Sequence, residues 1–263
     1  MLFGTATDEP TSFAILDRYV EAGGTFIDTA NNYAYWINGS QGGESEELLG
    51  RWRRSRGVGD EIVIATKLGG RPLTPSTTIS DNLEGLSAKV IRESVGLLGA
   101  SNHWAWRLER SRRLAAAAGL PGYEVLQYHH SYLRPRTDLP SRRSPDGDLG
   151  VLSGDLLSYL RGELGVALVA YSPLLGGAYV RADKPLGVEF DHAGTPVRLA
   201  ALREVAKQTG ATVNQVVLAW LIGGEIPMIP LVGASSVAQL DESLAAVDLE
   251  LTVEQRTRLD AAR

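Results

Sequence analysis

Three residues with acid–base side chains follow two short apolar segments that we predict to be strands. Asp28 ends the segment Thr25–Asp28, Tyr33 lies five residues further on, and Lys67 ends the segment Ile62–Lys67. Adjacent parallel strands would bring these side chains together at one edge of a sheet. A phenol has an ordinary pKa of about 10, and a neighbouring ammonium favours its anion. Tyr33 is therefore a candidate general acid for a carbonyl that receives a hydride, with Asp28 holding Lys67 charged.

Each of the three residues also has a purely structural interpretation. Asp28 could cap a turn, Tyr33 could pack on the rim of the sheet, and Lys67 could be a solvated strand end. Short motifs of this kind also occur by chance. The functional interpretation therefore requires that the three side chains meet in space.

A second candidate site lies in the segment Gly233–Ser236, between the last predicted strand and a helix. Free backbone N–H groups and the helix dipole attract an anion there, and this is the usual phosphate site of a β/α barrel. The alternative is simple capping by Ser235 or Ser236. No Arg or Lys lies between Gly233 and Val247, so no basic partner for a 2′-phosphate is visible.

Apolar residues at helical spacing alternate with short apolar runs along the chain. Predicted strands cover Thr25–Asp28, Ile62–Lys67, Glu124–Tyr128, Val166–Tyr171 and Met228–Val232. Predicted helices run from Pro10 to the stop at Gly23–Gly24 and over Ser45–Arg54, Ser87–Leu98, Ala105–Ala118, Leu152–Leu164, Arg198–Thr209, Asn214–Gly223, Ser236–Ala246 and Thr252–Ala262. Capping boxes are expected at Thr212 with Gln215 and at Thr252 with Gln255.

This alternation predicts an α/β fold with a parallel sheet, either a barrel or a doubly wound open sheet. The barrel is favoured because no Gly-x-Gly-x-x-Gly follows an early strand and no P-loop is present. Residues 1–263 are expected to form one barrel domain, since about 250 residues is usual for that fold. The segments Leu133–Gly150 and Leu186–Pro196 are predicted to be long polar loops.

Composition excludes several classes of protein. The net charge of −5 and the mixing of charges leave no basic stripe for nucleic acid. With no cysteine, the chain has no disulfide framework, thiolate nucleophile or Cys-based metal site. No signal peptide and no membrane-spanning apolar run is visible, so a cytoplasmic location is expected, without a membrane partner.

Several motifs occur in the order found in aldo-keto reductases, which the chain resembles over nearly its whole length. They are Phe26–Tyr33, Ala65–Lys67, Ser101–Asn102, Gln127, Ala170–Leu174 and Pro230–Ser235. The resemblance implies a (β/α)8 barrel that transfers a hydride from NADPH to a small carbonyl substrate. It places Asp28, Tyr33 and Lys67 in the family's catalytic tetrad.

The same resemblance implies a set of cofactor-binding residues. Ser101, Asn102 and Gln127 match groups that bind the nicotinamide carboxamide, and Tyr171 matches the aromatic residue stacked on that ring. Residues that would line the pyrophosphate are Ser172, Leu174 and Gly176; those that would hold the adenosine end are Gly233, Ser235, Gln239, Glu242 and Ser243. A preference for NADPH over NADH rests on the resemblance alone.

The chain departs from the family pattern between Lys67 and Ser101. A strand ending in the tetrad His, a helix and most of a further strand are absent before Ser101, and no His precedes His103. The strand that normally precedes Phe3 is also missing. We therefore count about five barrel strands plus a remnant, and expect an incomplete barrel, since closure needs eight strands. His129 and His130 could face the site or be polar rim groups.

Two functions remain open at this stage. One is an NADPH-dependent reductase of aldehydes or ketones, whose pocket Tyr35 and Trp36 help to shape. The other is a barrel that binds a nucleotide or a partner without turnover. The family also resembles channel-associated regulatory subunits, which keep the cofactor site and serve as binding modules. Neither the physiological substrate nor the oligomeric state follows from the sequence.

Overall fold

The computed structural model describes residues 2–37, 39–70, 73–74, 83, 85, 98–139, 148–163 and 165–263. The chain divides into two compact units. Unit 1 comprises Met1–Gly96 with Gly233–Asp241, and unit 2 comprises Leu97–Val232 with Glu242–Arg263. Each unit is described by itself.

The Met1–Gly96 part of unit 1 contains two helices and two strands that alternate along the chain among its described residues. Helix α1 (Glu9–Glu21) begins after Asp8, whose side chain accepts a hydrogen bond from the Thr11 N–H, and Pro10 lies in its first turn. Strand β1 (Phe26–Asp28), helix α2 (Glu44–Arg56) and strand β2 (Val63–Ala65) follow. The strands are parallel and in register, with Asp28 opposite Ala65.

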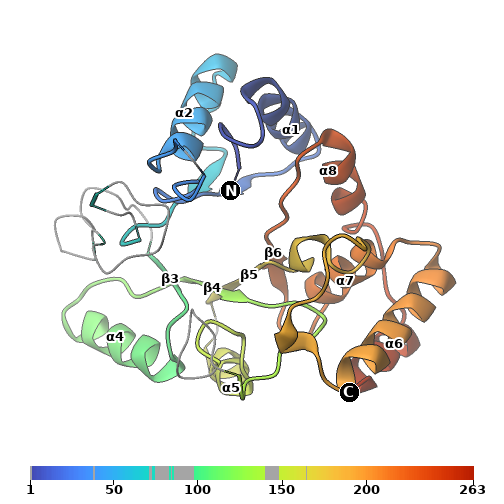
Figure 1. The fold of residues 1–263 in the computed structure, drawn as a ribbon. Coiled ribbons are helices and arrows are strands. Elements are labelled where there is room, and N and C mark those ends of the chain that lie inside the picture. Colours follow the sequence, from blue (N-terminus) through green and yellow to red (C-terminus); the bar gives the residue numbers. More distant parts are fainter. Residues whose placement is uncertain are drawn as a thin grey trace. The chain divides into compact units, whose positions relative to one another are not determined.

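The core of unit 1 lies between these helices and strands, which run from blue to cyan in Figure 1. Trp52 of α2 is the largest fully buried side chain of this core, and its ring nitrogen donates to Asp17 of α1 at 2.8 Å. The other buried members are Leu16, Ile27, Leu48, Leu49 and Ile62. Packing of α1 and α2 on β1 and β2 thus fixes the strand ends on which the candidate acid–base residues stand.

Unit 2 contains a four-stranded parallel sheet in the order β3-β4-β5-β6. Its strands are β3 (Gly99–Ser101), β4 (Val125–His129), β5 (Ala167–Tyr171) and β6 (Met228–Pro230). Ser101 lies opposite Gln127, and His129 lies opposite Tyr171. Ser101, His129 and Tyr171 are the last residues of β3, β4 and β5, so they lie at the carboxyl edge of the sheet, and Gln127 lies two residues before that edge.

Helices follow each of these strands. They are α4 (Ala105–Ala117), α5 (Gly154–Gly162), α6 (Gly194–Thr209), α7 (Val213–Ile222), α8 (Val237–Leu244) and α9 (Val253–Ala261). Both predicted capping boxes, at Thr212 and at Thr252, are confirmed. Helix α8 spans the point at which the two units divide.

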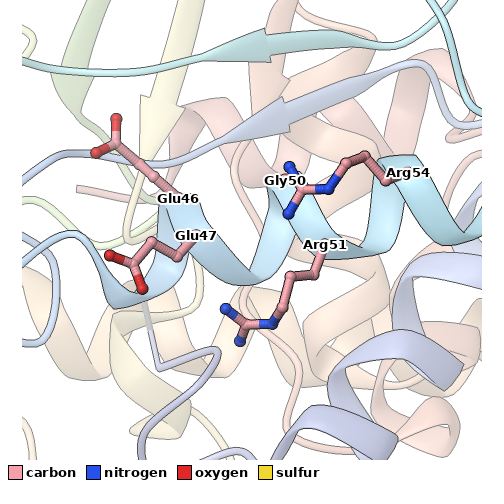
Figure 2. A pocket seen from close by; sticks show the side chains of 5 residues that line it. All are labelled: Glu46, Glu47, Gly50, Arg51 and Arg54. Carbon is pink, nitrogen blue, oxygen red and sulfur yellow. The ribbon is translucent and has the colours of Figure 1, made fainter.

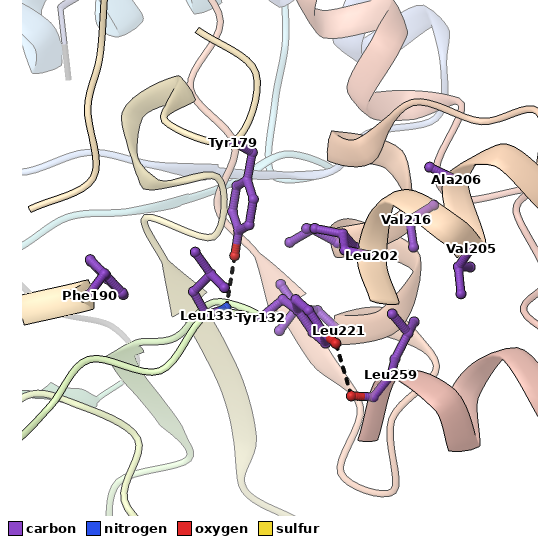
Figure 3. Packing of buried hydrophobic residues seen from close by; sticks show 11 residues of the cluster. Tyr132, Leu133, Tyr179, Phe190, Leu202, Val205, Ala206, Val216, Leu221 and Leu259 are labelled. Carbon is purple, nitrogen blue, oxygen red and sulfur yellow. Dashed lines mark hydrogen bonds between the residues drawn. The ribbon is translucent and has the colours of Figure 1, made fainter. Parts of the chain in front are cut away.

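Figure 3 shows the largest core cluster of unit 2, where α6, α7 and α9 meet the segment after β4. Two tyrosines bury their rings here and satisfy their hydroxyls. Tyr132 donates to the Leu259 carbonyl at 3.0 Å, and the Tyr179 hydroxyl accepts from the Leu133 N–H at 2.9 Å. Burial raises the pKa of each of these two phenols to about 12, so both stay neutral.

The structure confirms the α/β class: in the described residues every strand pairing is parallel, and six strands are present. These are the five predicted strands and the remnant, which forms β3. The predicted helix Ser87–Leu98 lies outside the described residues except for Leu98. The prediction of a loop over Leu186–Pro196 is wrong in part, because a 3₁₀ turn at Val188–Phe190 buries Phe190 and α6 begins at Gly194.

No helix in the described part of the chain combines the length and the apolar character needed to cross a membrane.

Candidate functional site

Asp28, Tyr33 and Lys67 meet in unit 1 as predicted. The Lys67 ammonium nitrogen lies 2.5 Å from Asp28 Oδ2 and 2.8 Å from the Tyr33 hydroxyl oxygen. The Tyr33 hydroxyl also lies 3.1 Å from Asp28 Oδ2. The three groups form a closed triangle of hydrogen bonds, and an ammonium this close favours the phenolate and so makes the phenol a stronger acid.

A fourth group, the main-chain carbonyl of Thr29, completes the surroundings of Lys67. Its oxygen accepts from Lys67 Nζ at 2.8 Å, so the ammonium donates to three different residues. Burial lowers the pKa of Lys67, while the charge and the hydrogen bond of Asp28 oppose that shift. Asp28 supports the charged form as expected, but burial has the larger effect.

The chain between Asp28 and Tyr33 is held to β2 by main-chain hydrogen bonds. Thr29 N donates to Ala65 O at 2.7 Å, and Asn31 N donates to Lys67 O at 3.1 Å. Ala34, directly after Tyr33, is fully buried and has a φ of 70°. A non-glycine residue at positive φ is uncommon and costs about 1–3 kcal/mol, and such residues cluster at functional sites. The turn that places Tyr33 is thus a strained one.

Two aromatic side chains lie beside the Tyr33 ring. Trp36 packs edge-to-face against Tyr33, at 6.5 Å between ring centroids, and against Tyr35, at 5.3 Å. Tyr35 is buried, whereas Trp36 is 39% exposed. Trp36 therefore presents apolar ring surface to solvent next to the candidate acid.

In unit 2 the structure brings together the four residues expected at the nicotinamide. Ser101, at the end of β3, is the register neighbour of Gln127 in the middle of β4, and the Tyr171 hydroxyl donates to Asn102 Oδ1 at 3.1 Å. His129 lies edge-to-face against Tyr171, at 5.6 Å between ring centroids. Asn102 has a φ of 58°, a second strained position at a candidate site residue.

The predicted pyrophosphate residues form the turn after β5. Ser172 has a φ of 53°, Leu175 of 50° and Gly176 of 66°, and Leu175 N donates to Ser172 O at 3.1 Å. Ser172 and Gly176 are exposed, and Leu174 is half-buried. In the described residues only Ala34, Asn102, Ser172 and Leu175 are non-glycine residues at positive φ, and each is a candidate site residue or adjoins one.

The predicted adenosine residues divide between the units. In unit 1 the Ser235 N–H and hydroxyl both donate to Gln239 Oε1, at 2.9 and 3.0 Å, while Ser236 Oγ accepts from Gln239 N. Ser236 therefore caps α8, and Gly233 is exposed before it. In unit 2 the Glu242 carboxylate accepts from the Thr212 hydroxyl at 2.8 Å, and Ser243 is half-buried.

A shallow hollow on the outer face of α2 is separate from these residues. Figure 2 shows Glu46 and Glu47 at one end of it, Arg51 and Arg54 at the other, and Gly50 between them. Its lining includes none of the candidate residues, and Arg51 is paired with Glu9 at 2.8 Å. We assign no role in the chemistry to this hollow.

The sequence analysis did not identify Thr29 and Ser45 as site residues. Thr29 contributes its main-chain carbonyl, which every residue type has, so the sequence could not indicate this role. Ser45 bonds to the Thr29 hydroxyl, which only the packing of α2 on the β1 segment reveals.

Comparisons with known proteins agree with the geometry. A model of the aldo/keto reductase family matches residues 1–96 and 152–263. The match includes Asp28, Tyr33, Lys67 and the segment Gly233–Ser243, whereas Ser101, Asn102 and Gln127 lie outside it.

Individual relatives cover almost the whole chain. The uncharacterized oxidoreductase Rv2298 of Mycobacterium tuberculosis is 32% identical over 95% of this chain and 81% of its own length. Norsolorinic acid reductase stcV of Emericella nidulans is 28% identical over 96% of this chain and 71% of its own length.

The alignments also bear on the segment that the chain lacks. The uncharacterized oxidoreductase YrpG of Bacillus subtilis is 25% identical over 307 aligned positions, covering 97% of this chain and 87% of its own length. The chain has only 263 residues, so this relative carries residues that the chain does not. The family match and the relatives show that the chain belongs to the aldo/keto reductase family of β/α-barrel oxidoreductases.

Proposed function

We propose that this oxidoreductase reduces an aldehyde or ketone to the alcohol, with NADPH as hydride donor and Tyr33 as general acid. The observation that carries the proposal is the 2.8 Å separation between the Tyr33 hydroxyl and the Lys67 ammonium. As negative charge develops on the carbonyl oxygen, the Tyr33 proton moves to it, and the ammonium stabilises the phenolate that remains.

Each neighbour has a defined part in this step. Asp28, with a side chain only 9% exposed, orients Lys67 and favours its charged form. The Thr29 carbonyl accepts a further N–H of the ammonium, so the orientation of the Lys67 ammonium is fixed. Because the cluster is largely withdrawn from water, these charges act more strongly than they would in solvent.

The residues of unit 2 fit a nicotinamide. Hydroxyl and amide groups of Ser101, Asn102 and Gln127 are the types that bind a carboxamide, and the half-buried Tyr171 ring offers a stacking surface. Gly176 at positive φ lets the chain pass close to a phosphate without a Cβ. NADPH, when bound, supplies the hydride. Gly233, Ser235, Gln239, Glu242 and Ser243 would hold its adenosine end.

A spectrophotometric assay tests this function directly. NADPH oxidation is followed at constant enzyme concentration with a panel of small aldehydes and ketones, and the alcohol product is identified by chromatography. Stoichiometric alcohol that disappears in Tyr33→Phe supports the proposal. NADPH binding without any alcohol, by a preparation of confirmed mass, contradicts it.

One observation favours a second candidate, a nucleotide-binding barrel without turnover. No His precedes His103 in the sequence, so the fourth member expected of the tetrad is absent. Cofactor fluorescence separates the two candidates: saturable NADPH binding with no consumption of any carbonyl compound supports the binding protein.

A further inference from the structure

We propose that Thr29 and Ser45 are a positioning pair for the catalytic lysine, because their hydroxyl–hydroxyl hydrogen bond fixes the carbonyl to which Lys67 donates. This inference rests on the proposed function of Tyr33 and Lys67. It assigns a role in the chemistry to Ser45, in the first turn of α2.

The pair is buried and well formed. Thr29 is 0% exposed and Ser45 is 1% exposed. The Thr29 hydroxyl donates to Ser45 Oγ at 3.0 Å. The hydrogen bond between the two hydroxyls offsets the cost of burying them, since a buried hydroxyl without a partner is destabilising.

The hydrogen bond acts on the residue that receives Lys67. Thr29 is held by its N–H to Ala65 O at 2.7 Å and by its side chain to Ser45, and its carbonyl accepts from Lys67 Nζ at 2.8 Å. With strand β2 holding one side of the residue and helix α2 the other, the carbonyl cannot turn away. The ammonium thereby keeps its third hydrogen bond while the other two point to Asp28 and Tyr33.

Among the residues that the structure describes, few charged or titratable groups surround Lys67. Asp28 of β1 and Tyr33 of the following turn contact it directly. From α2, Glu46 accepts from the hydroxyl of Thr66, the residue before Lys67, at 2.5 Å. The Thr29 carbonyl carries no charge, so it orients the ammonium without changing the net charge of the cluster.

Three variants test the pair. Thr29→Val and Ser45→Ala each leave one buried hydroxyl without its partner, and both should lower stability. The double variant Thr29→Val/Ser45→Ala removes both hydroxyls, so no orphan remains and most stability should return. A purely structural role therefore predicts that the double variant behaves like the wild type, whereas a positioning role predicts that its chemistry stays impaired.

The principal readout does not need turnover. The sequence contains only four lysines, so protein labelled with carbon-13 at lysine Cε gives few signals, and Lys67→Met identifies the one of interest. In the double variant the Lys67 titration should move to lower pH by about 0.5 to 1 unit, because one charge-assisted hydrogen bond is weakened. The alkaline limb of kcat should move in the same direction, with kcat lower by about threefold to tenfold.

Two controls accompany these variants. Thr29→Ser keeps the hydroxyl and should restore the wild-type titration. Ser12→Ala removes a serine that is equally buried in α1, where its hydroxyl donates to Asp8 O at 2.7 Å. It should cost stability but leave the Lys67 titration unchanged.

A double variant with wild-type stability, Lys67 titration and kcat overturns the inference. That result is distinct from failure of the proposed function, in which Tyr33→Phe keeps the full rate. If the double variant unfolds, the single variants Thr29→Ser and Ser45→Ala are compared instead. The inference then requires that the Lys67 titration lies at lower pH in Ser45→Ala than in Thr29→Ser.

Discussion

The hydroxyl oxygen of Tyr33 lies 2.8 Å from the ammonium nitrogen of Lys67, although the two residues are far apart along the chain. This distance places a proton donor and a cation in direct contact. The cation also lies 4.8 Å from the centre of the Tyr33 ring, so it faces both the hydroxyl and the π system.

Replacing Tyr33 by Phe should lower kcat by about 10²–10⁴-fold, because the change deletes the positioned acid and keeps the ring. The dissociation constant of NADPH should not change. Tyr123→Phe is the matched control, since it removes the phenol hydroxyl of a half-buried tyrosine of unit 2 that is not a candidate site residue. Full aldehyde reduction by an active Tyr33→Phe preparation would show that another group donates the proton.

Lys67 should make the stability of the protein depend on pH. Burial lowers the pKa of Lys67 in the folded state below its ordinary value of 10.5. Between these two pKa values the unfolded chain binds more protons, so the free energy of unfolding rises with pH in that window. Urea unfolding from pH 8 to 10.5 measures the effect as the difference in the free energy of unfolding between the wild type and Lys67→Met. A difference that falls as pH rises would contradict the burial of the charge.

The cofactor site gives a prediction that is independent of turnover. Tyr171→Ala removes the stacking ring, and Ser235→Asp places a carboxylate where a cofactor phosphate is expected, so each should weaken NADPH binding. Fluorescence titration provides the dissociation constants. Tyr171→Phe keeps the ring and Ser235→Asn keeps the shape without the charge, so both should bind nearly as the wild type does. Equal affinities in all four variants would reject the proposed site.

Much of this arrangement was predictable from the sequence, for physical reasons. Helical periodicity and the Thr212 and Thr252 capping boxes are local, and the structure confirms them. The meeting of Asp28 with Lys67 follows from the parallel pairing of β1 and β2.

Other features depend on packing or main-chain geometry and were not predictable. The positive φ of Ala34 has no sequence signal, because alanine rarely adopts it. The burial of Phe190 depends on contacts with distant helices, which is why a polar loop was expected there. Residue types alone also gave no indication of the tether between Thr29 and Ser45.

A stability prediction concerns the core of unit 2 in Figure 3. The Tyr179 hydroxyl, in a side chain almost fully buried, pairs with Ser131 Oγ at 2.7 Å and accepts from Leu133 N at 2.9 Å. Tyr179→Phe leaves both partners buried without this bond and should lower the free energy of unfolding by about 1–3 kcal/mol. Denaturant unfolding measures the loss, and an unchanged midpoint would mean that water replaces the hydroxyl.

The last prediction concerns the segment missing between Lys67 and Ser101. Strand β3 pairs only with β4 among the described residues, and Val63 of β2, the last described strand before the insertion point, is 48% exposed. Inserting a relative's strand–helix–strand segment with its His before β3 should cover apolar strand surface, sharpen thermal unfolding and raise kcat, because a drier site strengthens the electrostatics acting on the developing alkoxide.

A second chimera, identical except for Ala in place of the inserted His, separates the contribution of the fold from that of the imidazole. If the missing segment matters chiefly as structure, both chimeras gain cooperativity and rate. If the His orients and polarises the carbonyl, kcat rises much more in the chimera with His than in the chimera with Ala. Thermal unfolding then improves equally in both chimeras. Rates and melting curves are measured for the parent chain and both chimeras. A parent chain that already matches the His chimera in kcat and cooperativity would show that its own residues suffice and that the barrel does not require the segment.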